Sequence, residues 1–331
     1  MRVIIDAMGG DRAPLEILKG VLSALPECDA EFTLVGDSDA ISRTAKQIGL
    51  SSDKFETVAT SSVITMNDDP IKSFRHKKDS SMMVGLQMLA DGKGDAFVSA
   101  GNTGALFTGA TFIVKRVQGI KRAAIGTVIA AGKPFLLLDA GANISVTPDY
   151  LEQFAIMGSA YMKKMYHIAQ PTVGLLNNGT EDCKGTQLQI ETNALLRTCS
   201  SVKYIGNVEG NEAMFGACDV LVADGFTGNI FLKTAEGSFR LLLKTLNCQY
   251  CKNSINKFSA VLFHKSLQEM RHNFDPSEYG GSPILGILKP VIKAHGSSDA
   301  KAIKNAILQA VKYAQSGAAD EISKAIQNAE K

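Results

Sequence analysis

Short apolar runs alternate with amphipathic stretches along most of the chain. Several runs are continuous in Val, Ile and Leu, which is typical of strands buried on both faces of a parallel sheet. The stretches between them have helical spacing. This alternation predicts an α/β fold, a doubly wound three-layer sandwich. The expected strands are residues 2–6, 32–36, 62–66, 95–99, 124–129, 134–139, 172–177, 203–208 and 219–223.

Helix starts can be placed where a capping residue precedes a periodic stretch. Pro14 suits the first turn of a helix over 13–25. Asp79 or Ser80 can cap a helix that ends near Gly92. Pro148 begins a helix that reaches about Lys164, and two more helices are expected over about 299–316 and 318–329.

The pattern changes after residue 229. Between Phe231 and about Phe274 apolar residues recur at helical spacing with basic residues between them, and no strand is predicted. We therefore expect one α/β domain over residues 1–331, with a protruding helical hairpin inserted at about 231–275.

Loops of Gly, Asn, Thr and Asp follow four of the expected strands. Three are expected to open a helix directly, at Gly101–Gly104, Asp139–Asn143 and Asp224–Asn229, and a glycine-rich turn follows the first strand at Asp6–Asp11. Such loops direct free backbone N–H groups outward at a helix N-terminus, which favours phosphate or another oxyanion. Any doubly wound fold turns through small residues, but several such loops together indicate a phosphate-handling cleft beyond the carboxyl ends of the strands.

Most of the polar residues in these loops have a structural alternative. Lys184 can meet phosphate or a developing oxyanion as a point charge, or can be an exposed surface lysine. Asn102, Thr103 and Asn229 can contact phosphate or simply cap a helix. The remaining candidates at strand ends, Asp139 and Asp224, can work on substrate or form Asx turns and N-caps.

Two further segments allow both interpretations. The run Lys72–Asp79 is densely basic, so it can attract an acidic partner or be a solvated loop. The turn Ala294–Asp299 can be another anion site or a capped helix start, in which His295 is structural.

Composition narrows the classes of function. The formal net charge of +2 gives no strong field for nucleic acid. No apolar run reaches the roughly 18 residues that span a bilayer. The first residues form an expected strand, not a secretory signal, which favours a cytoplasmic protein. Of the six cysteines, Cys248 and Cys251 have CxxC spacing, but no second pair or close histidines accompany them, so we expect reduced thiols and no metal site.

The sequence lacks GxSxG, HExxH and GxxxxGK[ST], and it shows no nucleophilic Ser or Cys with a partner base. If phosphate itself is the nucleophile, the protein needs only to hold it near an acyl carbonyl and stabilise the oxyanion.

Taken in order, eight motifs resemble the PlsX family, the bacterial phosphate acyltransferases. The match runs from residue 1 to about 316 and is specific as a set. There is one departure, at Glu212, where the family commonly has Asp. The motifs lie at 6–11, 77–81, 99–105, 139–143, 175–185, 206–210, 224–229 and 295–298.

The resemblance implies a fold akin to isocitrate and isopropylmalate dehydrogenases and phosphotransacetylases, a homodimer, and no cofactor. It implies transfer of a long-chain acyl group from acyl carrier protein to inorganic phosphate. The acyl phosphate would then feed an acyl-phosphate:glycerol-3-phosphate acyltransferase in phospholipid synthesis. The acidic carrier would meet basic surface at Lys72, Arg75, Lys77, Lys78, Lys115, Arg116, Lys121 and Arg122. The hairpin would pack in the dimer or rest peripherally on a membrane surface.

On these motifs we expect Lys184 and Asn229 to be catalytic. Contacts to phosphate or to the acyl-phosphopantetheine arm are expected from Asp6, Gly9, Gly10, Asp11, Gly101, Asn102, Thr103, Gly104, Asp139, Asn143, Asn177, Glu181, Asp224, Gly225, Gly228, His295, Gly296 and Ser297. The alternatives are a nicotinamide-dependent dehydrogenase, which lacks a GxGxxG after the first strand here, and a non-catalytic scaffold that binds anions or the carrier.

Overall fold

The computed structural model describes residues 1–129, 133–250 and 280–329. Their strands form one eleven-stranded sheet in the order β3-β2-β1-β4-β11-β10-β5-β6-β9-β7-β8. The strands are β1 (Arg2–Asp6), β2 (Glu31–Gly36), β3 (Phe55–Ala59), β4 (Ala96–Ser99), β5 (Ala124–Ile129), β6 (Phe135–Leu138), β7 (Thr172–Asn177), β8 (Lys203–Glu209), β9 (Val220–Val222), β10 (Ser282–Leu285) and β11 (Val291–Lys293).

Two parallel halves are joined by an antiparallel centre. The first half runs from β3 to β11 and the second from β6 to β8. Between them β10 pairs antiparallel with both β11 and β5, and β5 pairs antiparallel with β6. The expected parallel sheet is therefore confirmed for the halves and wrong at the centre. The links from β5 to β6 and from β10 to β11 are too short for the crossover that a parallel pair needs.

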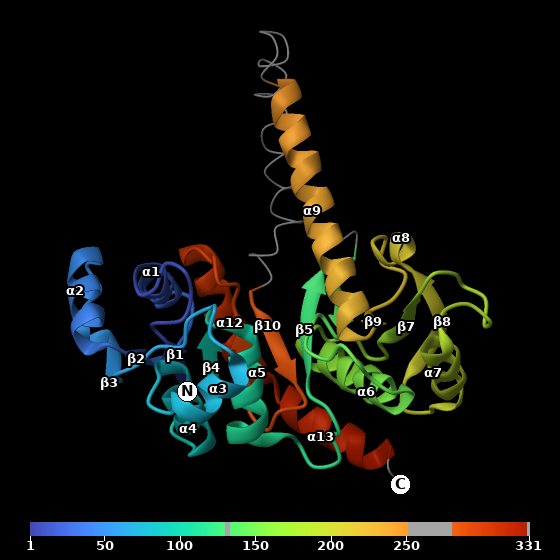
Figure 1. The fold of residues 1–331 in the computed structure, drawn as a ribbon, viewed down its shortest axis with the longest axis horizontal. Helices are drawn as coiled ribbons and strands as arrows, with labels where there is room; N and C mark the ends of the chain where they lie inside the picture. The colour runs from blue at the N-terminus through green and yellow to red at the C-terminus, as the bar shows by residue number, and fades with distance from the viewer. Residues whose placement is uncertain (130–132, 251–279, 330–331) are drawn as a thin grey trace.

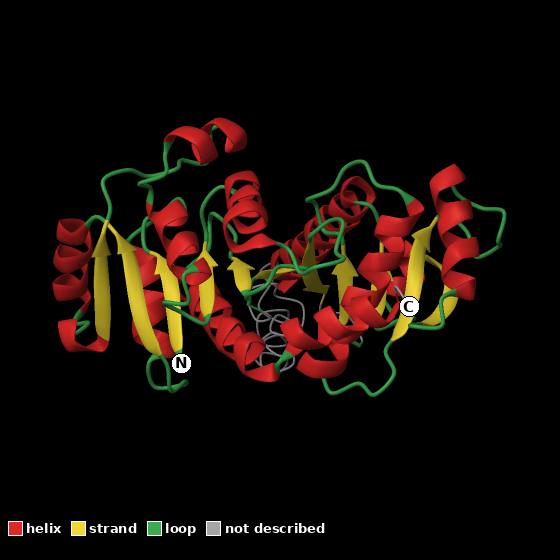
Figure 2. Cartoon of the chain, turned by 90° about the horizontal axis from the view of Figure 1, so that it is seen from below, coloured by secondary structure: helices red, strands yellow, loops and turns green. Residues whose placement is uncertain are grey.

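Helices cover both faces of the sheet (Figure 2), which makes the expected three layers. Alternate residues of one strand enter different cores: Ile5 belongs to one buried cluster and Ile4 to the other. The helices are α1 (Leu15–Ala24), α2 (Ser38–Ile48), α3 (Pro70–His76), α4 (Ser81–Ala90), α5 (Thr103–Gly109), α6 (Pro148–Met165), α7 (Gln187–Thr198), α8 (Gly210–Ala213), α9 (Gly225–Tyr250), α12 (Ala300–Ser316) and α13 (Ala318–Ala329), with a 3-10 turn η1 (Ser52–Lys54) and a π-helical segment η2 (Ala110–Lys115) after α5.

Two expectations were wrong, and two strands were missed. Residues 62–66 are not a strand, because β3 lies earlier, at the sheet edge, where none of its residues is buried. The strands β10 and β11 were not predicted. The loop Asp139–Asn143 does not open a helix directly, since α6 begins only at Pro148.

The first helix of the expected hairpin is confirmed as α9, which leaves the body between the two halves and projects away from it (Figure 1). The rest of the expected hairpin, residues 251–279, lies outside the described residues.

Candidate functional site

Three loops meet at the carboxyl edge of the first half, because β1, β4 and β11 are parallel neighbours. We call Asp6–Asp11, Ser99–Gly104 and Lys293–Ser297 the first loop cluster. The backbone N–H of Asp11 donates to the Gly296 carbonyl over 2.8 Å, and that of Ala294 donates to the Ser99 carbonyl over 2.9 Å. The sequence motifs at 6–11, 99–105 and 295–298 are thus brought together, although nearly the whole chain separates them.

Glycine permits this close approach. A methyl group at Gly9 would lie 2.5 Å from the Asp6 carboxylate and 2.8 Å from the Gly101 nitrogen. The Asp6 carboxylate is buried and accepts from the Ser99 hydroxyl over 2.6 Å. Burial raises the pKa of Asp6, and hydrogen bonds from Ser81, Ser99 and the Met8 N–H oppose that shift. Asp6 therefore ties two loops together from inside the cluster.

Asn102 caps α5. Its side-chain oxygen accepts from the Ala105 N–H over 3.0 Å, and its nitrogen donates to the carbonyls of Met66 and Asp68 over 3.1 Å each. The alternative role as a cap is thus confirmed, and a direct contact of its side chain with phosphate would have to replace these bonds. Thr103 is exposed at the first position of α5.

The second half has its own loop cluster, because β6, β9 and β7 are parallel neighbours. We call Asp139–Asn143, Asp224–Asn229 and Asn177–Lys184 the second loop cluster. The Gly225 N–H donates to the Asn143 carbonyl over 2.7 Å. A methyl group at Gly228 would overlap the Asp139 carbonyl oxygen, and one at Gly141 would lie 3.5 Å from the side chain of Asn229.

Both aspartates of this cluster have the structural role left open by the sequence. The buried Asp139 carboxylate accepts from the N–H groups of Ile125, Gly141, Ala142 and Asn143 and from the Asn143 side chain. Asp224 accepts from the N–H groups of Phe226 and Thr227 and so caps α9. They shape the loops by binding the backbone N–H groups of residues 141–143, 226 and 227, so these groups are not available to an anion.

Lys184 lies in the exposed loop between β7 and α7. Its side chain is 46% exposed, and its ammonium is 4.0 Å from the Glu181 carboxylate. Asn177 fixes this loop by donating from its side chain to the Lys184 carbonyl over 3.1 Å. Lys184 therefore follows the strand beside β9, on the same edge as Asn229, and its catalytic role stays a prediction.

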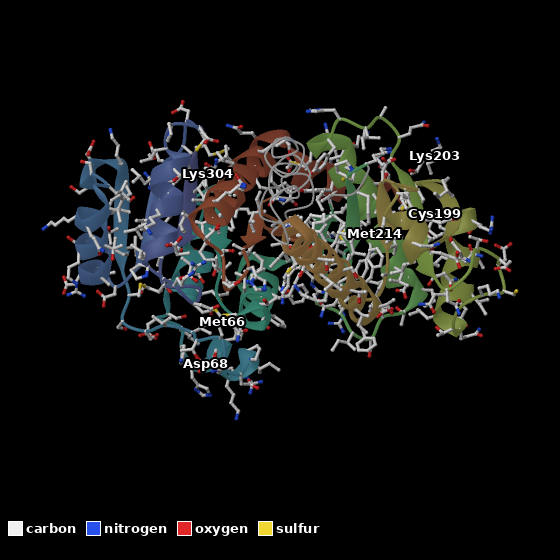
Figure 3. The ribbon with its side chains drawn as sticks, turned by 90° about the horizontal axis from the view of Figure 1, so that it is seen from above. Met66, Asp68, Cys199, Lys203, Met214 and Lys304 are labelled. Atoms are coloured by element: carbon white, nitrogen blue, oxygen red, sulfur yellow. The ribbon has the colours of Figure 1, made fainter. Side chains whose placement is uncertain are left out.

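His295 is held within its turn. Its Nδ1 lies 2.8 Å from the Ser297 hydroxyl, and Arg12 donates to the Ser297 carbonyl over 2.8 Å. Burial lowers the pKa of His295, and the positive charges of Lys233 and Lys293 lower it further. Lys233 is on α9, which begins in the second loop cluster, so this helix connects the two clusters. In Figure 3, Met66 of the first half and Met214 of the second half lie on either side of α9.

Sequence reasoning missed Lys293. It ends β11, is only 8% exposed, and its ammonium donates to the Ala294 carbonyl. Burial lowers its pKa to about 8, while Asp11 and Asp6 oppose the shift and Lys233 adds to it. The available signal was a lone lysine inside the apolar run Val291–Ala294, which required β11 to be recognised as a strand.

The described residues offer few metal-binding or reactive groups outside the two loop clusters. Within residues 1–129, 133–250 and 280–329, no three His, Cys, Asp or Glu residues are arranged to hold a metal ion. Cys28, Cys183, Cys199, Cys218 and Cys248 are free thiols, while Cys251 lies outside the described residues. Burial raises the pKa of Cys218 to about 12, so its thiol is unreactive. In the described segments, no helix has the length and apolar content to cross a membrane.

Solved structures of similar shape show the same fold. A phosphotransacetylase from Streptococcus pyogenes matches 96% of this chain and 94% of its own, with a TM-score of 0.63 and 17% identity. A branched-chain phosphotransacylase from Enterococcus faecalis V583 matches 95% and 99%, with a TM-score of 0.59 and 17% identity. At these identities the likeness establishes architecture alone.

Sequence comparison is more specific. The model of the family described as "Fatty acid synthesis protein" matches residues 1–321. A phosphate acyltransferase from Thermoanaerobacterium thermosaccharolyticum is 45% identical over 94% of this chain and 92% of its own. One from Bacillus subtilis strain 168 is 42% identical over 94% and 93%. The resemblance seen in the motifs is thereby confirmed, and the chain belongs to the fatty acid synthesis protein family that includes these phosphate acyltransferases.

Proposed function

We propose that this chain is a phosphate acyltransferase that moves a long-chain fatty acyl group from an acyl carrier protein thioester to orthophosphate, yielding acyl phosphate for phospholipid synthesis. The observation that carries the proposal is the match, along nearly the whole chain, to curated phosphate acyltransferases. The first loop cluster supports it, because its glycine loop lies at the start of α5, where the first N–H groups of a helix have no partner within the helix.

The reaction needs positioning more than a protein nucleophile. The second pKa of orthophosphate is about 7, one unit above that of a phosphate monoester, so a substantial share is the nucleophilic dianion at neutral pH. One of its oxygens attacks the thioester carbonyl, a C–O bond forms, the C–S bond breaks, and the thiolate leaves on the carrier and takes a proton from water. We propose that phosphate lies between the loops 101–104 and 225–229, and that Lys184 and Asn229 orient the substrate or stabilise the tetrahedral oxyanion.

A product assay tests this function. Purified protein is mixed with palmitoyl carrier protein, orthophosphate and hydroxylamine, which traps acyl phosphate as the hydroxamate. Hydroxylamine also cleaves the thioester slowly by itself, so the sample without phosphate sets the background. We expect phosphate and protein together to raise the formation of hydroxamate and free carrier thiol well above that background. A folded sample that binds the carrier but forms no hydroxamate would favour the scaffold alternative.

Lys184→Ala is expected to lower kcat by about tenfold or more, because a positively charged oxyanion donor is lost. The loss in kcat should be smaller than that caused by removing a buried donor, because Lys184 is half-exposed and water can partly replace its ammonium. Steady-state kinetics at saturating phosphate measure it. Lys203→Ala, an exposed lysine on β8, is the matched control, and equal activity of both variants would exclude the role.

We propose that Lys293 supplies the buried positive charge for phosphate. Because its pKa is about 8, the ammonium loses its proton as pH rises through 8, and the KM for phosphate should then increase. Asp6 and Asp11 face this ammonium and raise its pKa, whereas Lys233 lowers it. Lys293→Met should raise this KM about tenfold at pH 7 and abolish its rise above pH 8. A wild-type pH profile in Lys293→Met would contradict the assignment.

The acidic carrier is proposed to dock on α3. Lys72 and Arg75 are exposed there, whereas Lys77 pairs with Asp68 over 2.6 Å and Lys121 with Asp149 over 2.6 Å. Reversing both charges, Lys72→Glu with Arg75→Glu, should raise the KM for acyl carrier protein about tenfold at low salt and leave the KM for phosphate unchanged. The control reverses Arg43 and Lys46 on α2. Identical carrier KM values for the two double variants would reject docking on α3.

We further propose that the chain forms a homodimer. We also propose that an acyl-phosphate:glycerol-3-phosphate acyltransferase consumes the acyl phosphate. Leu241 and Leu242 on α9 are exposed, so either dimer packing or peripheral contact with a membrane surface would cover them. Sedimentation velocity measures the first and vesicle flotation the second.

A further inference from the structure

An apolar groove of about 690 Å³ lies between β3, α3, α4 and η2, away from both loop clusters. Its volume falls in the range of small-molecule sites. Its lining combines apolar side chains with polar ones that carry charges of both signs. The apolar lining residues are Val58, Phe74, Met83, Val84, Met88 and Ile113, and the polar ones are Glu56, Lys78, Gln87, Asp91 and Lys93.

The helix α3 connects this groove to the first loop cluster. A methyl group at Gly104 would lie 2.6 Å from the Pro70 side chain, so the start of α3 is packed on the glycine loop that opens α5. Asn102 holds the preceding segment in place through the carbonyls of Met66 and Asp68. Phe74, one helical turn (about 6 Å) beyond Pro70, already lines the groove.

Exposed apolar side chains mark the path between the two sites. Ile71 is 59% exposed and Phe112 is 64% exposed, and the ring centroid of Phe112 is 5.6 Å from that of Phe74. Folding alone gains little from apolar side chains left in water. Together with Phe74 they form an apolar strip that begins beside Pro70, at the glycine loop, and leads into the groove.

We propose that this groove binds the fatty acyl chain of the thioester substrate, with the thioester carbonyl held at the first loop cluster. This inference rests on the proposed function. Three features point to an acyl chain as the occupant. The groove is continuous with the glycine loop, its lining is largely apolar, and the exposed cations Lys72 and Arg75 on α3 would face the acidic carrier.

The groove then sets the chain-length preference. It follows α4 from Met83 to Asp91, a rise of about 12 Å, and its lining turns polar at Gln87, Asp91 and Lys93. Methylene groups gain free energy along the apolar part and none beyond it. Long acyl chains should therefore bind more tightly than short ones until the apolar wall ends.

The test fills the groove. Val84→Trp should lower kcat/KM for palmitoyl carrier protein by about tenfold or more and leave that for butyryl carrier protein within about twofold. Met88→Gln, a substitution of similar size, should lower the palmitoyl value in the same direction, and it serves if Val84→Trp does not fold. The control is Ile205→Trp, at an exposed position on β8 in the other half. Equal losses for both chain lengths, or none, would overturn the proposal.

Direct binding separates this proposal from the proposed function. The fluorescence of cis-parinaric acid, a long-chain polyene fatty acid, is titrated with the wild-type protein in the absence of carrier and phosphate. We expect saturable binding that Val84→Trp weakens by about tenfold and Ile205→Trp does not change. Binding without acyl phosphate formation would refute only the function, whereas activity without groove-dependent binding would refute only the groove. A Val84→Trp protein whose sole defect is loss of self-association would assign the groove to a second copy of the chain and overturn the proposal.

Discussion

Gly228→Ala is expected to destabilise the protein by about 3 kcal/mol or more and to abolish most of its activity. The added methyl group would overlap the carbonyl oxygen of Asp139, a backbone atom that cannot turn away as a side chain could. Either the start of α9 or the Asp139 loop must shift. Since a displacement of about 1 Å in a catalytic constellation can cost about 10²-fold in rate, acyl transfer should fall at least that far.

Gly237→Ala is the matched control for this prediction. It lies on the same helix, none of the described residues has an atom within 4 Å of the position that its methyl group would take, and alanine favours helix over glycine. Its free energy of unfolding should rise by up to about 1 kcal/mol with activity unchanged. Urea unfolding monitored by circular dichroism and the hydroxamate assay measure both quantities. If Gly228→Ala were as stable and active as Gly237→Ala, the close approach of the two loops would not matter.

The sequence predicted most elements whose signals are local. Proline and N-cap signals placed α4 and α6 within a few residues, and the two C-terminal helices were also predicted close to their bounds. The edge strand β3 was missed because its side chains are only partly buried and its run mixes Glu and Thr with Phe and Val. The strands β10 and β11 were missed because they are short and pair with β5 and β4, which lie more than 150 residues earlier in the chain.

The candidate site was predicted as a set of loops but not as an arrangement. Which loops meet depends on strand order, and only the pairing of β11 with β4 brings Lys293 to the glycine loops. The aspartates show a different limit. Asp139 and Asp224 have the same sequence pattern whether they cap backbone N–H groups or contact substrate, because both roles require a carboxylate beside free donors. Only the three-dimensional arrangement of the loops distinguishes the two roles.

Asp139→Ala is expected to cost about 4 kcal/mol or more of unfolding free energy, because buried N–H groups that lose their acceptor cost about 1–3 kcal/mol each. The carboxylate accepts from Ile125, Gly141, Ala142 and Asn143 and from the Asn143 side chain, and none of its surface is exposed. A domain of ordinary stability would have little left, so thermal unfolding should begin far below the wild-type midpoint.

Asp37→Ala is the control, because Asp37 also accepts from two backbone N–H groups, those of Asp39 and Ala40, but at the exposed start of α2. Water can replace that acceptor, so the loss should be only about 1 kcal/mol. The difference between the two variants in free energy of unfolding, measured by chemical denaturation, therefore shows how much more an aspartate that accepts from backbone N–H groups contributes when it is enclosed in the second loop cluster. Equal losses would mean that water enters the Asp139 loop, and the second loop cluster would then lack the dry, fixed setting that an oxyanion site requires.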